Sequence, residues 1–281
     1  MQFIPAPRPS PIAGRWYSGD PDTLSGQVDG YIRQAEKSAD KINRKVIGLV
    51  VPHAGHVYSG LTAGYGYRQI LGEDRGLVVI LSPFHQYFSG DLLTTAFSSY
   101  QTPLGEIPVA TEILTDLDQR LQETGEGLRQ VEKDGEHSLE IQLPFLQRTL
   151  SGEFEILPLM LRSHNPAILR TLAGTLVTLL ADKKFLLVAS TDLSHFYPEE
   201  TAKEMDMRML AHIERMDPAG ALEAEKTGQA AACGVSAVAA MLWAAQSLGA
   251  RQAKILHYST SGDVSGDRAS VVGYGSAAIV K

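Results

Sequence analysis

Four short apolar runs, separated by segments long enough to form helices, constrain the fold of this chain more than any other feature. They cover residues 46–51, 77–81, 154–160 and 185–190, and Val, Ile and Leu dominate them. Runs of this length without strict polar alternation are typical of strands buried on both faces. Because helix-length segments separate them, the chain is predicted to form a largely parallel sheet.

Helical signals fill most of the intervening segments. Apolar spacing or helix-start residues predict helices over 23–38, 59–71, 111–121, 165–180, 199–215 and 218–226. Two further strands, near 254–259 and 270–280, are joined by a turn and favour an antiparallel hairpin. The expected fold class is α/β, with a mixed, largely parallel sheet flanked by helices on both faces.

The chain is expected to form one domain. Its 281 residues lie near the upper limit for a single core, and no long Pro/Ser-rich or charged linker divides them. The prolines at positions 5, 7, 9 and 11 enforce extended backbone near the N-terminus. We therefore expect a single domain over 1–281 that begins with an extended arm of about residues 1–20.

The net charge limits the classes of partner that this protein is expected to bind, and the cysteine content indicates its cellular compartment. A formal net charge of −7 offers no basic field for nucleic acid or anionic lipid, which favours a small-molecule substrate or a peptide partner. The single cysteine excludes an intrachain disulfide framework, and the N-terminus lacks the order of a signal peptide. We expect a protein of the reducing cytoplasm.

One uncharged segment, residues 227–250, is long enough to cross a bilayer. It is mostly Ala with interspersed Gly, Gln and Ser, so its hydrophobicity is well below that of a Leu/Ile/Val span. The segment therefore predicts a buried, closely packed helix, and no membrane association is expected.

Polar side chains follow three of the predicted strands. His53 lies two residues after 46–51 and His85 four residues after 77–81, while Asp192 and His195 lie two and five residues after 185–190. Because ligand-handling residues in open α/β sheets lie at the carboxyl ends of the strands, these side chains are expected to meet at one edge of the sheet. The sequence thus predicts a site there.

Each of these residues also has a purely structural interpretation. A single histidine after a strand is more often hydrogen-bonded to the protein than used as a ligand. Cys233, in an Ala-rich context, fits a small buried apolar residue, or else a thiolate near a helix start that is available to a metal. The residues alone leave both interpretations of Cys233 open.

The segment 136–146 carries a further histidine and carboxylate. His137 and Glu140 are spaced i, i+3, which would place them on one face of a helix, and Pro144 is expected to kink or restart that helix. Common catalytic motifs are absent from the sequence: it contains no GxGxxG, Walker loop, HExxH or GxSxG. Dinucleotide and Ser-His-Asp chemistry therefore lack support.

Six motifs in order give the chain a family resemblance. It resembles the Memo family, whose prokaryotic members are labelled AmmeMemoRadiSam system protein B and whose eukaryotic counterpart is called mediator of cell motility. The resemblance implies a fold like that of class III extradiol dioxygenases of the LigB type, with a non-haem metal at the strand ends. The motifs are AGRWY at 13–17, VPHAGHVYSG at 51–60, SPFH at 82–85, EHSLE at 136–140, STDLSH at 190–195 and ACG at 232–234.

The same resemblance implies roles for individual residues. His53, His85 and Cys233 would hold the metal, and His195 would act as a nearby acid/base. Asp192, His137 and Glu140 would orient or polarise groups around the pocket. Ring-cleaving dioxygenases of that class use two histidines and a carboxylate, so a cysteine here replaces the carboxylate and argues against extradiol cleavage.

Two functional hypotheses follow from the resemblance. The first is a metal-dependent oxidoreductase of unidentified substrate, with Fe(II) bound, or Cu or Zn in its place. The second is a non-catalytic module on a dioxygenase-like fold that binds a peptide, a phosphate or a partner protein. The family label also implies functional association with radical SAM and Ammecr-type proteins.

Overall fold

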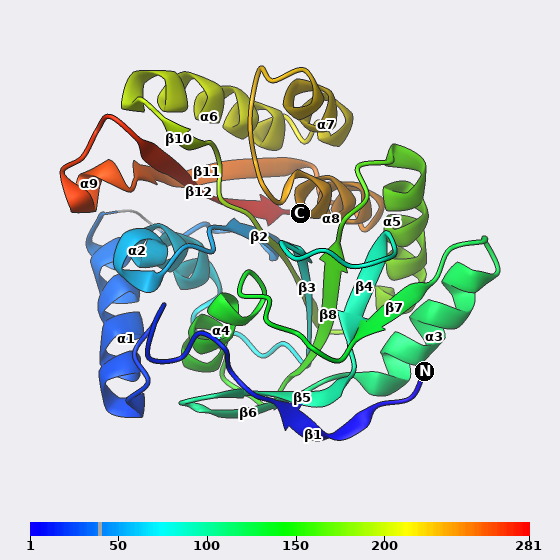
Figure 1. The fold of residues 1–281 in the computed structure, drawn as a ribbon. Helices are drawn as coiled ribbons and strands as arrows, with labels where there is room; N and C mark the ends of the chain where they lie inside the picture. Colours follow the sequence, from blue (N-terminus) through cyan, green and yellow to red (C-terminus); the bar gives the residue numbers. More distant parts are fainter. Residues whose placement is uncertain (39–40) are drawn as a thin grey trace.

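The structure, a computed structural model, describes residues 1–38 and 41–281 (Figure 1). A sheet of nine strands forms its centre, and a sheet of three strands lies beside it. The strands are β1 (Ile4–Arg8), β2 (Val46–Val51), β3 (Leu77–Pro83), β4 (Leu92–Thr95), β5 (Phe97–Thr102), β6 (Gly105–Pro108), β7 (Leu128–Val131), β8 (Glu155–Leu161), β9 (Phe185–Ser190), β10 (His195–Tyr197), β11 (Gln252–Thr260) and β12 (Val271–Val280).

The central sheet has the mixed, largely parallel arrangement that the sequence predicts. Its strand order is β10-β12-β2-β9-β3-β8-β4-β7, and β11 pairs with β12. Strands β2, β9, β3 and β8 are parallel neighbours, whereas β12 runs antiparallel to β2, β10 and β11. The expected hairpin of the last two long strands is confirmed. Parallel pairing also brings the carboxyl ends of β2, β9 and β3 to one edge.

Helices cover both faces of this sheet (Figure 1). On one face of β2, a Cβ atom added to Gly48 would lie 3.1 Å from Met241 of α8. On the other face of β2, Val51 packs against Gly66 of α2. The helices are α1 (Pro21–Ser38), α2 (His56–Tyr67), η1 (Arg68–Ile70), α3 (Thr111–Gln122), η2 (Glu140–Gln142), α4 (Leu143–Thr149), α5 (Pro166–Leu180), α6 (Glu199–Glu214), α7 (Pro218–Lys226), α8 (Val235–Ser247) and α9 (Gly262–Ser265).

The N-terminal arm is more tightly integrated than a segment laid over a surface. Strand β1 pairs in parallel with β5, and β5 pairs with β6 to complete the smaller sheet. Arg8, the last residue of β1, is only 1% exposed. Figure 1 shows the arm running from the smaller sheet toward α4 and α1. A charged side chain this deeply buried requires partners, and these are described with the site.

The Ala-rich segment forms a buried helix, as the sequence predicts. Eleven of the thirteen residues of α8 are buried, and close packing against β3 and β9 explains the preference for Ala there. Cys233 precedes this helix by two residues instead of lying within it. Within residues 1–38 and 41–281, no helix is long and apolar enough to cross a membrane.

The prediction of a helix through 136–146 is wrong in its first part. Residues 136–139 form a loop and a turn, and helical structure begins only at η2 and continues in α4, where Pro144 lies in the first turn. Backbone N–H groups in the first turn of a helix have no partner within the helix, so the missing N–H of Pro144 removes no hydrogen bond there. His137 and Glu140 therefore do not share a helical face.

Candidate metal centre

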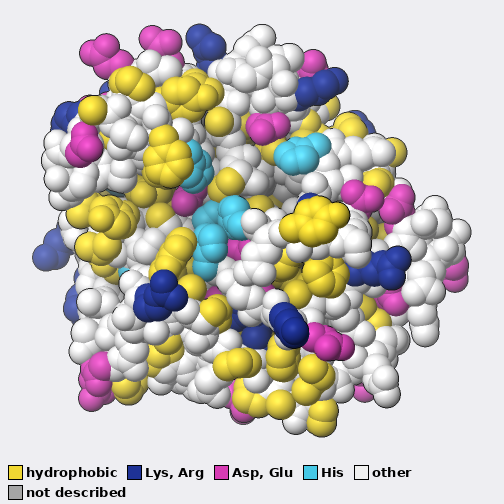
Figure 2. Space-filling model, viewed as in Figure 1, with side chains coloured by type: hydrophobic (Ala, Val, Ile, Leu, Met, Phe, Trp, Pro, Cys, Tyr) yellow, Lys and Arg dark blue, Asp and Glu magenta, His cyan; other side chains and the backbone are white. Residues whose placement is uncertain are grey.

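The carboxyl ends of β2, β3 and β9 surround a cavity of about 440 Å³. His53, His85, His137, Asp192 and His195 all line it. Figure 2 shows histidine side chains in a hollow bordered by hydrophobic side chains. The expectation that polar residues after three different strands meet at one edge of the sheet is thus met by the geometry.

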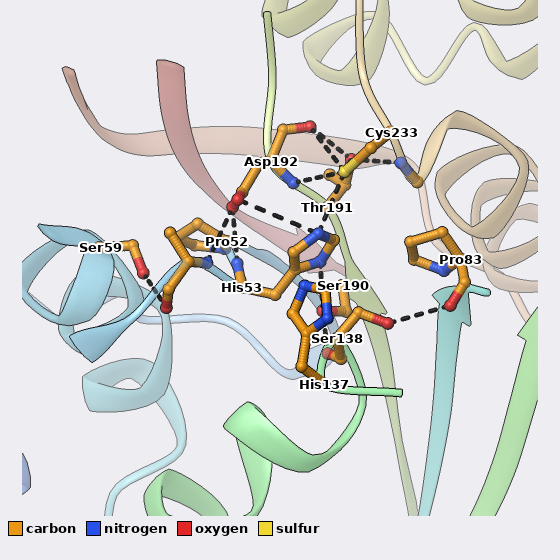
Figure 3. Close-up of polar contacts among 12 residues, drawn as sticks. Pro52, His53, Ser59, Pro83, His137, Ser138, Ser190, Thr191, Asp192 and Cys233 are labelled. Atoms are coloured by element: carbon orange, nitrogen blue, oxygen red, sulfur yellow. Dashed lines mark hydrogen bonds and ion pairs between the residues drawn. The ribbon is translucent and has the colours of Figure 1, made fainter. Parts of the chain in front are cut away.

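Hydrogen bonds fix the tautomer of His53, which is 1% exposed (Figure 3). Its Nδ1 lies 3.1 Å from Oγ of Ser190, and that hydroxyl donates to the Ser138 carbonyl while accepting from Gln142. Because the Ser190 hydroxyl donates its own proton to the Ser138 carbonyl, it can only accept a hydrogen bond from His53. Nδ1 of His53 therefore carries the hydrogen, and Nε2 has a free lone pair. Burial and the charge of His85 lower the pKa of His53 to about 3, which keeps the ring neutral.

A buried carboxylate orients His85. Glu136, 1% exposed, accepts hydrogen bonds from Nδ1 and the backbone N–H of His85 at 2.9 Å and 2.6 Å. Burial by itself would raise the pKa of Glu136, but the His85 hydrogen bond and the charges of His85 and His137 outweigh it and hold the pKa well below its usual range. An ionised carboxylate on Nδ1 leaves Nε2 of His85 as the ligand atom.

His137 completes a group of three imidazoles. One ring nitrogen from each of His53, His85 and His137 lies within 4.8 Å of the others. The His137 ring stacks on His85, with ring centroids 4.7 Å apart, and its Nδ1 lies 3.3 Å from Glu136. Burial lowers the pKa of His137 to about 4. Burial by itself would lower the pKa of His85, but the Glu136 carboxylate outweighs it and raises that pKa, so this ring binds a metal once it has lost a proton. Three imidazoles converging in this way form a group that could hold a metal ion.

Cys233 lies beside this group on the β9 side. Its Sγ is 3.1 Å from Nε2 of His53 and accepts from the backbone N–H of Asp192 at 3.3 Å (Figure 3). Metal–N and metal–S bonds of about 2.0–2.1 Å and 2.3 Å separate two such ligand atoms by roughly 3.0–3.5 Å, so one ion can contact both. Burial and the Asp192 charge raise the pKa of the thiol in the absence of metal. The assignment of Cys233 as a ligand stays a prediction.

Asp192 and His195 lie on the loop that leaves β9. The Oδ1 atom of Asp192 accepts from the backbone N–H groups of His53 and Ala54 at 2.7 Å and 3.3 Å, which fixes the loop after β2. Burial raises the pKa of Asp192. His195 begins β10 opposite Val272 and lines the same cavity. Both residues are therefore placed to contact a pocket occupant.

Glu140 is buried away from the residues that line the cavity. Its Oε2 accepts from Arg8 at 2.5 Å, and its Oε1 accepts from Tyr17 at 2.7 Å and from the Ser10 hydroxyl. Arg8 also pairs with Asp134 at 2.6 Å and donates to the Glu136 carbonyl. Glu140 thus ties the N-terminal arm to the loop that carries Glu136 and His137.

Three features of the site escaped sequence reasoning. In the sequence, Glu136 was noted only as the first residue of the EHSLE motif, and Ser190 only as the last residue of the predicted strand 185–190 and the first of the STDLSH motif. Trp16, seen in the sequence only within the AGRWY motif, lines the cavity with its ring centroid 4.2 Å from that of His137. A carboxylate directly before a candidate histidine was the one available signal, since metal-binding histidines commonly donate to a carboxylate.

Comparison with known proteins identifies the family of this chain. A MEMO1 family protein of Nitrosopumilus maritimus is 32% identical over 271 residues, covering 94% of this chain and 96% of the relative. Counterparts from Methanosarcina barkeri and Methanopyrus kandleri are 34% and 32% identical, with at least 94% of each chain covered. The family described as Memo-like protein matches residues 8–278, and the chain therefore belongs to the Memo-like family.

Proposed function

We propose that the protein is a metal-dependent oxidoreductase whose ion is held by His53, His85 and His137, with Cys233 beside them. The observation that carries this proposal is the convergence of three ring nitrogens within 4.8 Å among residues that line a cavity. Fe(II) is the ion that we propose first, and Cu or Zn are the alternatives.

The donor set fits such an ion. Imidazole nitrogens suit Fe, Cu and Zn, and a neighbouring thiol adds a softer ligand that also suits copper. Hydrogen bonds from His53 to Ser190 and from His85 to Glu136 occupy each Nδ1, so Nε2 is the atom of each ring that is available to an ion. A bound Fe or Cu ion would supply electron transfer and substrate coordination, while Zn would supply only Lewis-acid chemistry.

The surrounding residues have defined tasks in this proposal. His195, on the cavity wall, would move a proton to or from the substrate. Asp192 holds the β2 loop through the His53 and Ala54 amides and thereby fixes the position of the His53 ring. The thiol of Cys233 would remain reduced in a cytoplasmic setting, which we also propose.

The wider context is also a proposal. We infer a LigB-like arrangement of the site from the family resemblance. We also infer a small-molecule substrate, because the cavity is concave and largely apolar. Functional association with radical SAM and Ammecr-type proteins follows from the family resemblance. A non-catalytic recognition module on the same fold is the competing hypothesis, and metal analysis separates the two.

Metal content after purification without oxygen is the decisive measurement. We expect about one equivalent of Fe or Cu per chain by elemental analysis, and loss of most of it in His53→Ala and His85→Ala. His164→Ala is the matched control, because that histidine is exposed and lies outside the cavity lining. Its metal content should equal that of the wild type.

Two outcomes would contradict the proposal. Absence of stoichiometric metal, with His53→Ala indistinguishable from wild type, would remove the metal centre. Stoichiometric Zn without any Fe- or Cu-dependent oxidation of a substrate would retain the centre but reject the oxidoreductase. Binding of a peptide partner that survives chelation unchanged would instead favour the recognition module.

A further inference from the structure

We propose that the pocket takes a small organic carboxylate with a flat, apolar body, and that Arg15 at the cavity wall binds the carboxylate. This inference deepens the proposed function, on which it rests for treating the bound molecule as a substrate. The binding itself is measurable whether or not the protein turns the molecule over.

Among residues 1–38 and 41–281, Arg15 is the only Lys or Arg that lines the cavity. Arg8, Arg75, Arg148 and Arg268 each pair with a carboxylate. In the described part of the chain, Arg15 makes no side-chain hydrogen bond, ion pair or ring contact, and it is exposed. A guanidinium that no protein group satisfies is available to a ligand anion, which it can bind through two parallel hydrogen bonds.

The backbone around Arg15 is fixed against the start of α2. The N–H groups of Arg15 and Trp16 both donate to the Ile12 carbonyl, at 3.0 Å and 2.9 Å. The Trp16 carbonyl in turn accepts from the His56 N–H at 2.8 Å. This tight turn presents the Arg15 guanidinium and the Trp16 ring to the same cavity, so a ligand can contact both without a rearrangement of the chain.

The rest of the wall is apolar and aromatic. Trp16, Val57, Tyr58, Val272 and Tyr274 line the cavity, and Val57 and Tyr58 remain 63% and 42% exposed. Figure 2 shows hydrophobic side chains around the hollow that contains the histidines. Exposed apolar groups at the wall of a concave pocket gain free energy when a flat apolar molecule covers them.

Charge favours a monoanion over a phosphate. The cavity offers one guanidinium but also contains the Asp192 carboxylate, and the whole chain carries a formal charge of −7. Apart from the metal ion of the proposed function, a dianionic phosphate ester would find only the Arg15 guanidinium to offset this negative field. A carboxylate needs one guanidinium and matches its planar geometry.

Phenylacetate, phenylacetamide and phenyl phosphate are suitable probes. Calorimetric titration of the as-purified full-length protein, with its metal content measured, should give tightest binding for phenylacetate. Phenylacetamide, its neutral isostere, should bind about fivefold more weakly, since a partly exposed ion pair contributes up to about 1 kcal/mol. Equal affinity for the two, or tighter binding of phenyl phosphate, would overturn the proposal.

Variants of Arg15 locate the anion. Arg15→Ala should weaken phenylacetate binding about fivefold and leave phenylacetamide unchanged, and Arg15→Lys should restore part of the difference. Arg251→Ala is the matched control, because exposed Arg251 bonds to Val280 beside the start of β2, at the opposite edge of the sheet. Phenylacetate binding that survives Arg15→Ala but disappears on chelation would place the carboxylate on the metal and refute the inference.

Fluorescence provides an independent readout. The chain has two tryptophans, Trp16 in the cavity wall and Trp243 in the buried helix α8. Phenylacetate should change the emission of Trp243→Phe but not of Trp16→Phe; the reverse pattern would place the ligand elsewhere. If the metal analysis fails while this Arg15-dependent signal remains, the metal-dependent function is wrong and the carboxylate site stands.

Discussion

Nδ1 of His85 lies 2.9 Å from Oε1 of Glu136, and both backbone and side chain of His85 donate to the same buried carboxylate. The same oxygen accepts from the N–H groups of His137 and Ser138. One glutamate therefore sets the orientation of two of the three candidate ligands. Its four hydrogen bonds also explain why an ionised carboxylate is stable at a position with 1% exposure.

Replacement of Glu136 by Gln should weaken metal binding without removing any ligand. The amide keeps the shape but lacks the negative charge that holds the Nδ1 proton of His85, and loss of such a partner typically lowers metal affinity about 10–100-fold. Competition with a chromophoric chelator measures this change. Unaltered affinity in a correctly folded Glu136→Gln protein would show that the carboxylate does not support the ligands.

Substitution of Cys233 and His137 should identify the remaining ligand. If the ion is held by three histidines, His137→Ala loses it and Cys233→Ser keeps at least half of it. If His53, His85 and Cys233 form the set, the result is reversed, because a serine hydroxyl is a much poorer ligand for these ions. Elemental analysis of both proteins, prepared identically without oxygen, gives the answer.

Arg8→Ala should destabilise the protein strongly. The variant would leave the buried carboxylates of Asp134 and Glu140 without their cation, and an unpaired buried charge typically costs about 3–5 kcal/mol. Urea unfolding followed by circular dichroism measures the loss. Arg120→Ala, which breaks the exposed pair with Asp116, is the control and should change stability little. Similar effects of both substitutions would contradict the role given to Arg8.

His56 should make stability depend on pH. Burial lowers its pKa to about 4, and Nδ1 has no hydrogen-bond partner, so the folded protein holds the ring neutral. Because the folded pKa lies below the unfolded value of about 6.5, this contribution is fully present above pH 6.5 and is lost as pH falls toward 4.

The expected size of this effect is about 2–3 kcal/mol between pH 7.5 and pH 4.5, from 1.36 kcal/mol per pKa unit. The His56 ring contacts Tyr17, Tyr31 and Phe145. His56→Phe replaces this titrating ring with one that does not titrate. Urea unfolding of the wild type and of His56→Phe, each at pH 7.5 and pH 4.5 and without metal, isolates the contribution of His56. The other histidines titrate in both proteins, so their contribution cancels in the comparison. Parallel pH profiles would show that His56 is not held neutral.

Much of the fold was readable from the sequence because hydrophobic runs and helix signals are local. Strands β2 and β9 coincide with the predicted ranges 46–51 and 185–190, and α7 coincides with 218–226. Strand β1 was not expected as a strand, because its prolines indicated only extended backbone. Its pairing with β5 joins residues about 90 positions apart, and no local pattern specifies such a contact.

By itself, the sequence determined that His53, His85 and Asp192 meet. Parallel strands that share hydrogen bonds must end at the same edge, so a residue just past each strand is placed by the strand pattern alone. The tertiary structure decided the rest. His137 reaches the centre and Glu140 does not, because Arg8, 132 residues from Glu140, holds the loop that carries both. Side-chain direction in a loop depends on distant partners, whereas the end of a strand depends on the strand itself.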